Sequence, residues 1–184
     1  MLQQDIVNLI KVDERMMNIL RTVGTLGLPD WCVCAGFVRS KVWDYLQGLQ
    51  ETRLPDVDVV YFDAESTDES MEKEYERILI DLDSSVPWSV KNQARMHTKS
   101  GHAPYTSTAD GLSHFPEVCT AIGVYLNSNG EVNLVAPYGV EDLIKLIVRP
   151  TPFFTSGDKL TIYKQRIASK KWGATWNRLH IAYS

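Results

Sequence analysis

Residues 31–63 read WCVCAGFVRSKVWDYLQGLQETRLPDVDVVYFD, and this stretch decides the fold. It begins with a short apolar run at residues 31–35, which predicts a buried strand, and Gly36 ends that run. Residues 37–46 carry apolar side chains at helical spacing. After a polar loop, residues 56–63 predict a second strand. We therefore predict a strand–turn–helix–strand unit around which the rest of the chain is organised.

Two aspartates, Asp56 and Asp58, stand at the start of the second predicted strand. Side chains alternate between faces along a strand, so both carboxylates point the same way, about 6.6 Å apart along the backbone. Asp is depleted in strands, and strand stability does not favour such a pair. A divalent cation would remove the repulsion, and hard oxygen ligands suit Mg²⁺ or Mn²⁺. The alternative is a solvated strand start, with the aspartates facing water or capping a turn.

The turn at Gly36 and the helix after it add a second feature. Backbone N–H groups at a helix N-terminus form an anion site, and Arg39, Ser40 and Lys41 lie in the first turn. A phosphate cradle followed by a metal-binding carboxylate pair is a chemically coherent combination. The two features together favour a catalytic site over the solvated strand start.

Composition limits the class of protein. The chain has 184 residues, 44% of them hydrophobic, which is enough for one domain with a real core. Its net charge of −4 argues against a non-specific nucleic-acid binder but leaves a small nucleotide substrate open. We expect no membrane span, no signal peptide and, with three cysteines, no disulfide framework. These features predict a cytosolic location.

The remaining segments predict a mixed α+β sheet with helices on at least one face. An amphipathic helix, with one break at most, covers residues 5–22. A further helix follows Asp68 as its N-cap and ends near residue 83, and a strand covers residues 86–90. Residues 98–116 form a long polar loop with one short helical turn, and such loops are often functional. Residues 119–126 and 131–135 form a hairpin, a helix covers residues 140–148, and residues 158–172 form a basic helix.

At Gly36 and the Asp56-x-Asp58 pair the sequence resembles the nucleotidyltransferase fold of the DNA polymerase beta superfamily. In that superfamily the strand after the glycine turn and helix carries an acidic pair that binds two divalent metals. Further blocks, from residues 35–48 (AGFVRSKVWDYLQG) to residues 166–172 (RIASKKW), resemble a bacterial nucleotidyltransferase-like family. The resemblance implies one domain over residues 1–184. Its core would span about 24–100, and a helical and hairpin extension would span about 101–184.

The resemblance also implies roles for single residues. Asp56 and Asp58 match the metal-binding pair, and Gly36 matches the glycine that lets the backbone approach the triphosphate. Arg39 is a better phosphate ligand than Ser40, because the serine is displaced from its usual position in the superfamily.

The third acidic residue of the superfamily is expected near residues 88–92, where this chain has no acid. The neutral Asn92 is one candidate to replace it, as a metal or water ligand, and is also predicted to contact the nucleotide. Asp63 or Asp83 reaching in from elsewhere is another candidate. We also predict Arg95 as a phosphate or acceptor contact, with a surface ion pair as an equal alternative. For Gln93, a hydrogen bond at the helix start is favoured over contact with a base or acceptor.

The predicted function is metal-dependent transfer of a nucleoside monophosphate from a nucleoside triphosphate to an unknown hydroxyl acceptor. Mg²⁺ or Mn²⁺ would be the cofactor, and the acceptor would be a small molecule, a nucleotide or an RNA end. One alternative is a catalytically impaired nucleotide-binding or interaction module, which the missing acid favours. Another is a metal-dependent phosphohydrolase. We interpret the basic residues of 164–178 as a solvated helix face rather than an RNA contact. His97 and His102 are interpreted as structural, with proton transfer as the alternative.

Overall fold

A five-stranded mixed sheet forms the centre of the computed structural model, which describes residues 1–101 and 103–183. The strands lie in the order β3-β2-β1-β4-β5. Strand β2 is parallel to β3, and the other neighbours are antiparallel. The sheet confirms the predicted fold class, a mixed sheet with helices. The strand bounds are β1 Cys32–Cys34, β2 Val57–Tyr61, β3 Trp88–Asn92, β4 Gly123–Leu126 and β5 Val132–Val135.

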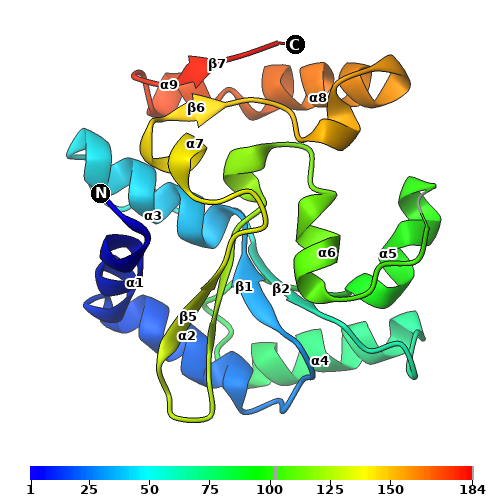
Figure 1. Ribbon diagram of the computed structural model, residues 1–184. Helices are drawn as coiled ribbons and strands as arrows, with labels where there is room; N and C mark the ends of the chain where they lie inside the picture. The colour runs from blue at the N-terminus through cyan, green and yellow to red at the C-terminus, as the bar shows by residue number, and fades with distance from the viewer. Residues whose placement is uncertain (102, 184) are drawn as a thin grey trace.

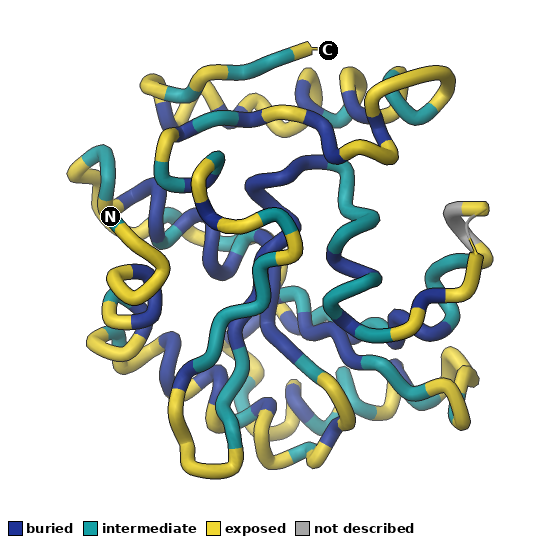
Figure 2. Tube along the Cα trace, in the orientation of Figure 1, coloured by how far each residue is buried: buried dark blue, intermediate teal, exposed yellow. Residues whose placement is uncertain are grey.

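Four helices pack against one face of this sheet and bury the main hydrophobic core with it (Figure 1). They are α1 Gln3–Lys11, α2 Glu14–Gly24, α3 Gly36–Gln47 and α4 Glu69–Leu82. The predicted helix of residues 5–22 is broken once, because the Asp13 carboxylate accepts the Met16 N–H and starts α2 there. In Figure 2, β1 and parts of these helices are buried, as are parts of the C-terminal layer above them.

A smaller apolar cluster lies on the opposite face of the sheet. Cys32, Cys34 and Val60 pack there against Leu112. The covering elements are α5 Gln93–Ser100 and α6 Thr108–Ser113, whereas the 3₁₀-helix η1 Val118–Thr120 contributes Cys119 to the main core. Residues 98–116, predicted as a loop with one helical turn, contain α6. Asp58 pairs with Cys34 in the strand register, so its side chain belongs to this less covered face.

The C-terminal part crosses one end of the sheet, as the upper layer of Figure 1 shows. It contains α7 Glu141–Ile144, β6 Ile147–Val148, η2 Pro152–Phe154, α8 Gly157–Lys170, α9 Trp172–Thr175 and β7 His180–Ile181. The prediction of one helix over residues 140–148 is wrong in its second half. Leu146 has a left-handed φ of 59°, and the next two residues pair with β7 as a strand. None of the described helices is long and apolar enough to cross a membrane.

Candidate functional site

A cleft of about 410 Å³ lies where the start of α3, the start of β2 and the helices α8 and α9 meet. We call it the basic cleft. Four cations line it against two carboxylates, so it carries excess positive charge in a chain of net charge −4. The charged lining residues are Arg39, Arg53, Arg166, Lys170, Asp56 and Asp58, and the others include Gly36, Ser40, Trp172 and Trp176.

The predicted aspartate pair lies in this cleft. Asp56 is exposed just before β2, whereas Asp58 is half-buried within β2 beside Ser89 of β3, whose hydroxyl hydrogen-bonds to it. Burial raises the pKa of the Asp58 carboxyl, and the Asp56 charge raises it further. A cation would relieve both effects. Two carboxylates and a hydroxyl are oxygen donors of the kind that Mg²⁺ and Mn²⁺ prefer, so these residues fit such an ion.

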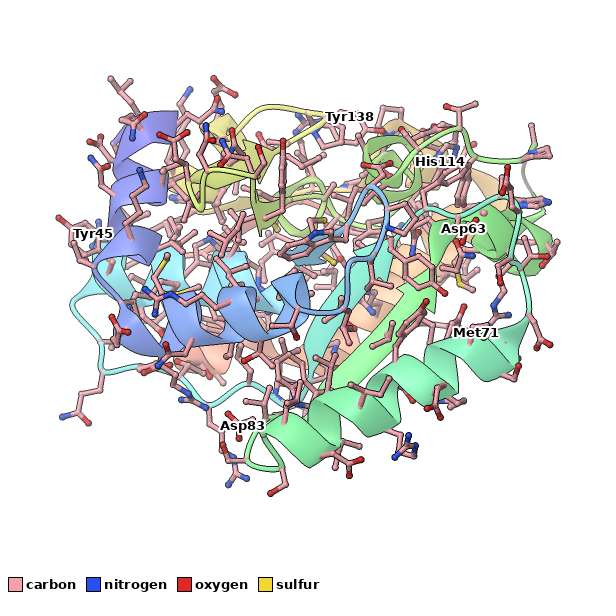
Figure 3. All side chains as sticks on the ribbon, turned by 90° about the horizontal axis from the view of Figure 1, so that it is seen from below. Tyr45, Asp63, Met71, Asp83, His114 and Tyr138 are labelled. Carbon is pink, nitrogen blue, oxygen red and sulfur yellow. The ribbon has the colours of Figure 1, made fainter. Side chains whose placement is uncertain are left out.

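Within the part of the chain that the structure describes, no third carboxylate joins this pair. Ser89 occupies the position directly beside Asp58 on β3. Asp63 follows β2 and its carboxylate accepts the N–H groups of residues 65 and 66, whereas Asp83 ends α4 and bonds to Ser85. Figure 3 shows Asp83 at the opposite end of α4 from Met71, and Asp63 on the Met71 side. Among the described residues, no three His, Cys, Asp or Glu side chains gather as a metal site.

Arg39 reaches the cleft through a box of tryptophan rings. Its guanidinium carbon lies 4.3 Å from the ring centroid of Trp172, 5.2 Å from Trp43 and 5.9 Å from Trp176. The residue is only 8% exposed, and within the described chain its Nε atom is buried without a hydrogen-bond partner. Burial lowers the pKa of this guanidinium, but an arginine stays charged at neutral pH. A buried charge with an unused donor is suited to an anion that enters the cleft.

The turn before α3 has its left-handed residue at Ala35, with φ 53°, and Gly36 is not among the positive-φ glycines. A Cβ added to Gly36 would lie 3.6 Å from an Arg39 nitrogen, which is ordinary contact. That Gly36 lets the backbone approach a triphosphate therefore stays a prediction. Ser40 is buried and lies 3.4 Å from the Arg39 guanidinium, so it contacts the arginine and lines the cleft.

Helix α8 supplies two cations to the cleft, although the sequence predicts a solvated face there. Arg166 and Lys170 line the cleft at a spacing of one helical turn. Arg166 is held by Glu117, which is fully buried, with a distance of 2.6 Å between Arg166 Nε and Glu117 Oε1. The Thr120 hydroxyl donates a second hydrogen bond to this carboxylate. The i, i+4 pair of cations was the only signal of this role in the sequence.

Two predicted site residues are used elsewhere. Asn92 is fully buried, where it caps α5 and bonds to the backbone of Asp63 and Ser66. Arg95 forms a two-pronged ion pair with the buried Glu72. Neither residue lines the basic cleft. For Arg95 the structure shows the ion-pair alternative, and for Asn92 it shows a structural role in place of the proposed metal or nucleotide contact.

His97 contacts Tyr105 edge-on, and His102 lies outside the described residues.

The comparisons with known proteins concern the family and the fold of this chain. The profile of a family described as nucleotidyltransferase matches residues 21–181. An NMR structure described as revealing a CCA-adding enzyme head domain is 34% identical, with a TM-score of 0.88, over 99% of this chain and 96% of that one. No curated protein sequence matches this chain.

Two longer enzymes share the fold at lower identity. A CCA-adding enzyme in complex with CTP is 15% identical with a TM-score of 0.62, and the match covers 99% of this chain and 43% of that one. The Thermotoga maritima CCA-adding enzyme complexed with tRNA is 15% identical with a TM-score of 0.60, and the match covers 99% of this chain and 42% of that one. This chain spans less than half of their length, and the likeness concerns the fold alone.

Proposed function

Because the chain belongs to the nucleotidyltransferase family, we propose that it moves a nucleoside monophosphate from a nucleoside triphosphate to a hydroxyl acceptor with the help of Mg²⁺ or Mn²⁺. One observation carries the proposal. The buried Arg39, whose Nε donor is unused, lines the same cleft as the Asp56–Asp58 pair. A triphosphate would give this guanidinium its missing acceptor and would present phosphate oxygens to an ion at the aspartates. We also propose that the protein is cytosolic, as its sequence predicts.

The residues of the chain divide the work in this proposal. The first N–H groups of α3 and Arg39 hold the outer phosphates, and Arg166 and Lys170 neutralise charge on the pyrophosphate as it leaves. Asp56 and Asp58 would hold the divalent ion, which, when bound, neutralises charge that builds on the α-phosphate. The acceptor hydroxyl gives up its proton to solvent, and its oxygen bonds to the α-phosphorus in line with the bond to pyrophosphate that breaks.

A second function is favoured by Ser89. Its hydroxyl stands where the resemblance led us to expect a third carboxylate, and a hydroxyl is a weaker metal ligand and no base. A nucleotide-binding module with little or no catalysis would keep Arg39 and the aspartate pair for binding alone. The two functions share the same triphosphate site and differ only in turnover.

Binding of the four common nucleoside triphosphates, measured by calorimetry with and without Mg²⁺, tests the site. We expect metal-dependent binding that the double variant Asp56→Asn, Asp58→Asn loses. A matched control is Asp81→Asn, because Asp81 is an exposed residue of α4. Binding that is equal with and without metal, or unchanged in the double variant, would contradict the proposed site.

Turnover then separates the two functions. Release of pyrophosphate in the presence of candidate acceptors identifies a transferase, and the relatives complexed with CTP and tRNA suggest RNA ends as the first acceptors to try. Tight metal-dependent binding without pyrophosphate release, over RNA, nucleotide and small-molecule acceptors, would favour the binding module.

A further inference from the structure

Asp44 of α3 is a buried carboxylate that the proposed function does not use. It is 4% exposed and does not line the basic cleft. Three donors bind it: the Thr52 N–H at 2.7 Å, the Thr52 hydroxyl at 2.8 Å and the Trp176 indole N–H at 2.7 Å. A buried carboxylate requires such donors, because a charge without partners is costly to bury.

Both partners of Asp44 belong to the walls of the basic cleft. Thr52 precedes Asp56 by four residues, so it lies on the wall that carries the aspartate pair. Trp176 lies on the wall of the phosphate ligand, with its ring centroid 5.9 Å from the Arg39 guanidinium carbon. One carboxylate therefore joins two walls that are more than 120 positions apart in the chain.

The segment between Thr52 and β2 has few other attachments. Within the described chain, residues 53–56 take part in no backbone hydrogen bond. The next attachment is the Val57 N–H, which donates to the Pro87 carbonyl at 2.8 Å. Behind Thr52 lies a cavity of about 30 Å³, which is room for one water molecule, so packing leaves space on that side. The position of Asp56 therefore depends on the bonds between Thr52 and Asp44.

On the other wall, the same carboxylate sets how one ring of the tryptophan box lies. Trp176 follows α9 and is 4% exposed, and its indole N–H donates to Asp44. A buried indole N–H needs an acceptor, so this bond favours one orientation of the ring. Because the ring covers Arg39, a displaced ring would leave the guanidinium less well directed towards the cleft.

We propose that Asp44 is a positioning residue that holds both walls of the triphosphate site. Through Thr52 it places Asp56 for the divalent ion, and through Trp176 it places Arg39 for the phosphates. This inference rests on the proposed function and adds a residue to its site. A carboxylate with a structural role alone would affect stability, whereas a positioning residue affects each side of the site through the donor that it holds.

The test measures the two sides of the site with separate probes on the full chain. Electron paramagnetic resonance of Mn²⁺ alone reports the aspartate pair, and calorimetry with inorganic tripolyphosphate, without metal, reports Arg39 and the other cations. Asp44→Asn should weaken both probes at least fivefold, because the asparagine NH₂ group is a donor and would face another donor. Removal of a negative charge would by itself strengthen tripolyphosphate binding, so a loss reports position rather than charge.

Two further variants remove one donor each. Thr52→Val should weaken Mn²⁺ at least threefold and leave tripolyphosphate unchanged, whereas Trp176→Phe should do the reverse. Thr151→Val is the matched control, because its buried hydroxyl donates to the Phe115 carbonyl outside the basic cleft. It should lower stability and change neither affinity. Thermal unfolding confirms that each variant is folded, and if Asp44→Asn does not fold, the two single-donor variants decide.

Three results would overturn the proposal. Unchanged affinity for either probe in folded Asp44→Asn would mean that the carboxylate does not hold both walls. Equal losses of both probes in Thr52→Val and in Trp176→Phe would indicate a general disturbance of the fold. Additive losses of tripolyphosphate affinity in the double variant Asp44→Asn, Trp176→Phe would show that the two residues do not act through one bond. Failure of the proposed function is distinct: the wild-type protein would then bind neither Mn²⁺ nor tripolyphosphate, and the inference would fall with it.

Discussion

Two buried or half-buried charges, Asp58 and Arg39, face the basic cleft and oppose folding when the cleft is empty of ligand. The pKa of Asp58 is raised by burial and by Asp56, and Arg39 has an unused donor on its buried Nε. Ionic groups without full partners destabilise a fold and are typical of binding sites. At the residue scale, we therefore expect Asp58 and Arg39 to lower the stability of the ligand-free fold and to favour binding of a ligand.

Asp58→Asn should stabilise the metal-free protein at pH 7. The folded-state pKa of Asp58 lies above the ordinary 3.8, so the fold loses stability as the pH rises from 3.8 through that raised value, and the loss is complete above it. We expect a gain of about 1 kcal/mol, or about 2–4 °C in Tm. The gain should fade as the pH falls towards 3.8, where the wild-type carboxyl is also neutral. Urea unfolding at several pH values measures it, and a less stable variant at pH 7 would contradict this account.

Arg39→Met should weaken triphosphate binding at least 10-fold and leave the protein folded. The methionine fills part of the space inside the tryptophan box and removes an incompletely paired charge, so stability should change little. Calorimetry with ATP and Mg²⁺ measures the affinity. Arg15→Met is the matched control, because Arg15 forms an exposed ion pair with Glu51 and does not line the basic cleft. Equal losses in both variants would argue against a specific role for Arg39.

At the scale of elements, helix α8 is attached to the sheet region by the Glu117–Arg166 pair. Glu117 is fully buried and lies just before η1, whereas Arg166 reaches it from α8. Arg166 also lines the basic cleft and the neighbouring cavity beside α5 and α6. Such a pair places a cation at the site and holds the helix that carries it. The effect on binding and the effect on stability are therefore coupled through one contact.

Glu117→Gln should weaken triphosphate binding several-fold and destabilise the fold by about 2–3 kcal/mol, because Arg166 loses a charged partner and a buried bond becomes neutral. A double-mutant cycle with Arg166→Gln measures the coupling between the two residues. We expect the second substitution to add little once the first is made. Additive effects on binding would mean that Glu117 does not position Arg166.

The contact between α4 and α5 gives a pH prediction. Burial raises the pKa of Glu72, but the hydrogen bonds from Arg95 and the Asn92 N–H lower it further, so the net pKa lies below the ordinary 4.5. A depressed carboxyl pKa stabilises the fold above pH 4.5 and loses this effect as the pH falls through the folded-state value. Arg95→Met should therefore destabilise the protein by about 3–5 kcal/mol at pH 7 and by much less near pH 3.

The same variant tests the early prediction that Arg95 contacts nucleotide. Because its guanidinium is occupied by Glu72 and lies outside the basic cleft, Arg95→Met should leave the affinity for ATP and Mg²⁺ unchanged in folded protein. A 10-fold loss of affinity below the melting transition would restore Arg95 to the nucleotide site.

At the scale of the whole molecule, the C-terminal segment completes a site that begins near residue 36. Trp172 and Trp176 lie 5.6 and 5.1 Å from the ring of Trp43, and the Trp176 indole N–H donates to Asp44 at 2.7 Å. These contacts join residues more than 120 positions apart and form the box around Arg39. The site thus depends on docking of α9 against α3.

Trp172→Ala should lower both stability and triphosphate affinity. Loss of a buried tryptophan typically destabilises a protein by about 3–5 kcal/mol, and Arg39 loses the ring nearest to its guanidinium. Trp31→Ala is a useful control, because Trp31 is half-buried and contacts Tyr125 away from the cleft. It should reduce stability without reducing the affinity measured on folded protein.

The sequence by itself determined the local features. Residues 31–63 predicted the strand, turn, helix and strand, and period-two alternation placed Asp56 and Asp58 on one face, because these patterns depend only on neighbours along the chain. Only the tertiary structure decided that α8 and α9 complete the cleft, that Arg95 and Asn92 are used elsewhere, and that Gln93 faces a cavity. Those outcomes depend on which distant segments meet in space, and the pairing of buried charges and rings across long sequence separations leaves no periodic signal in the chain.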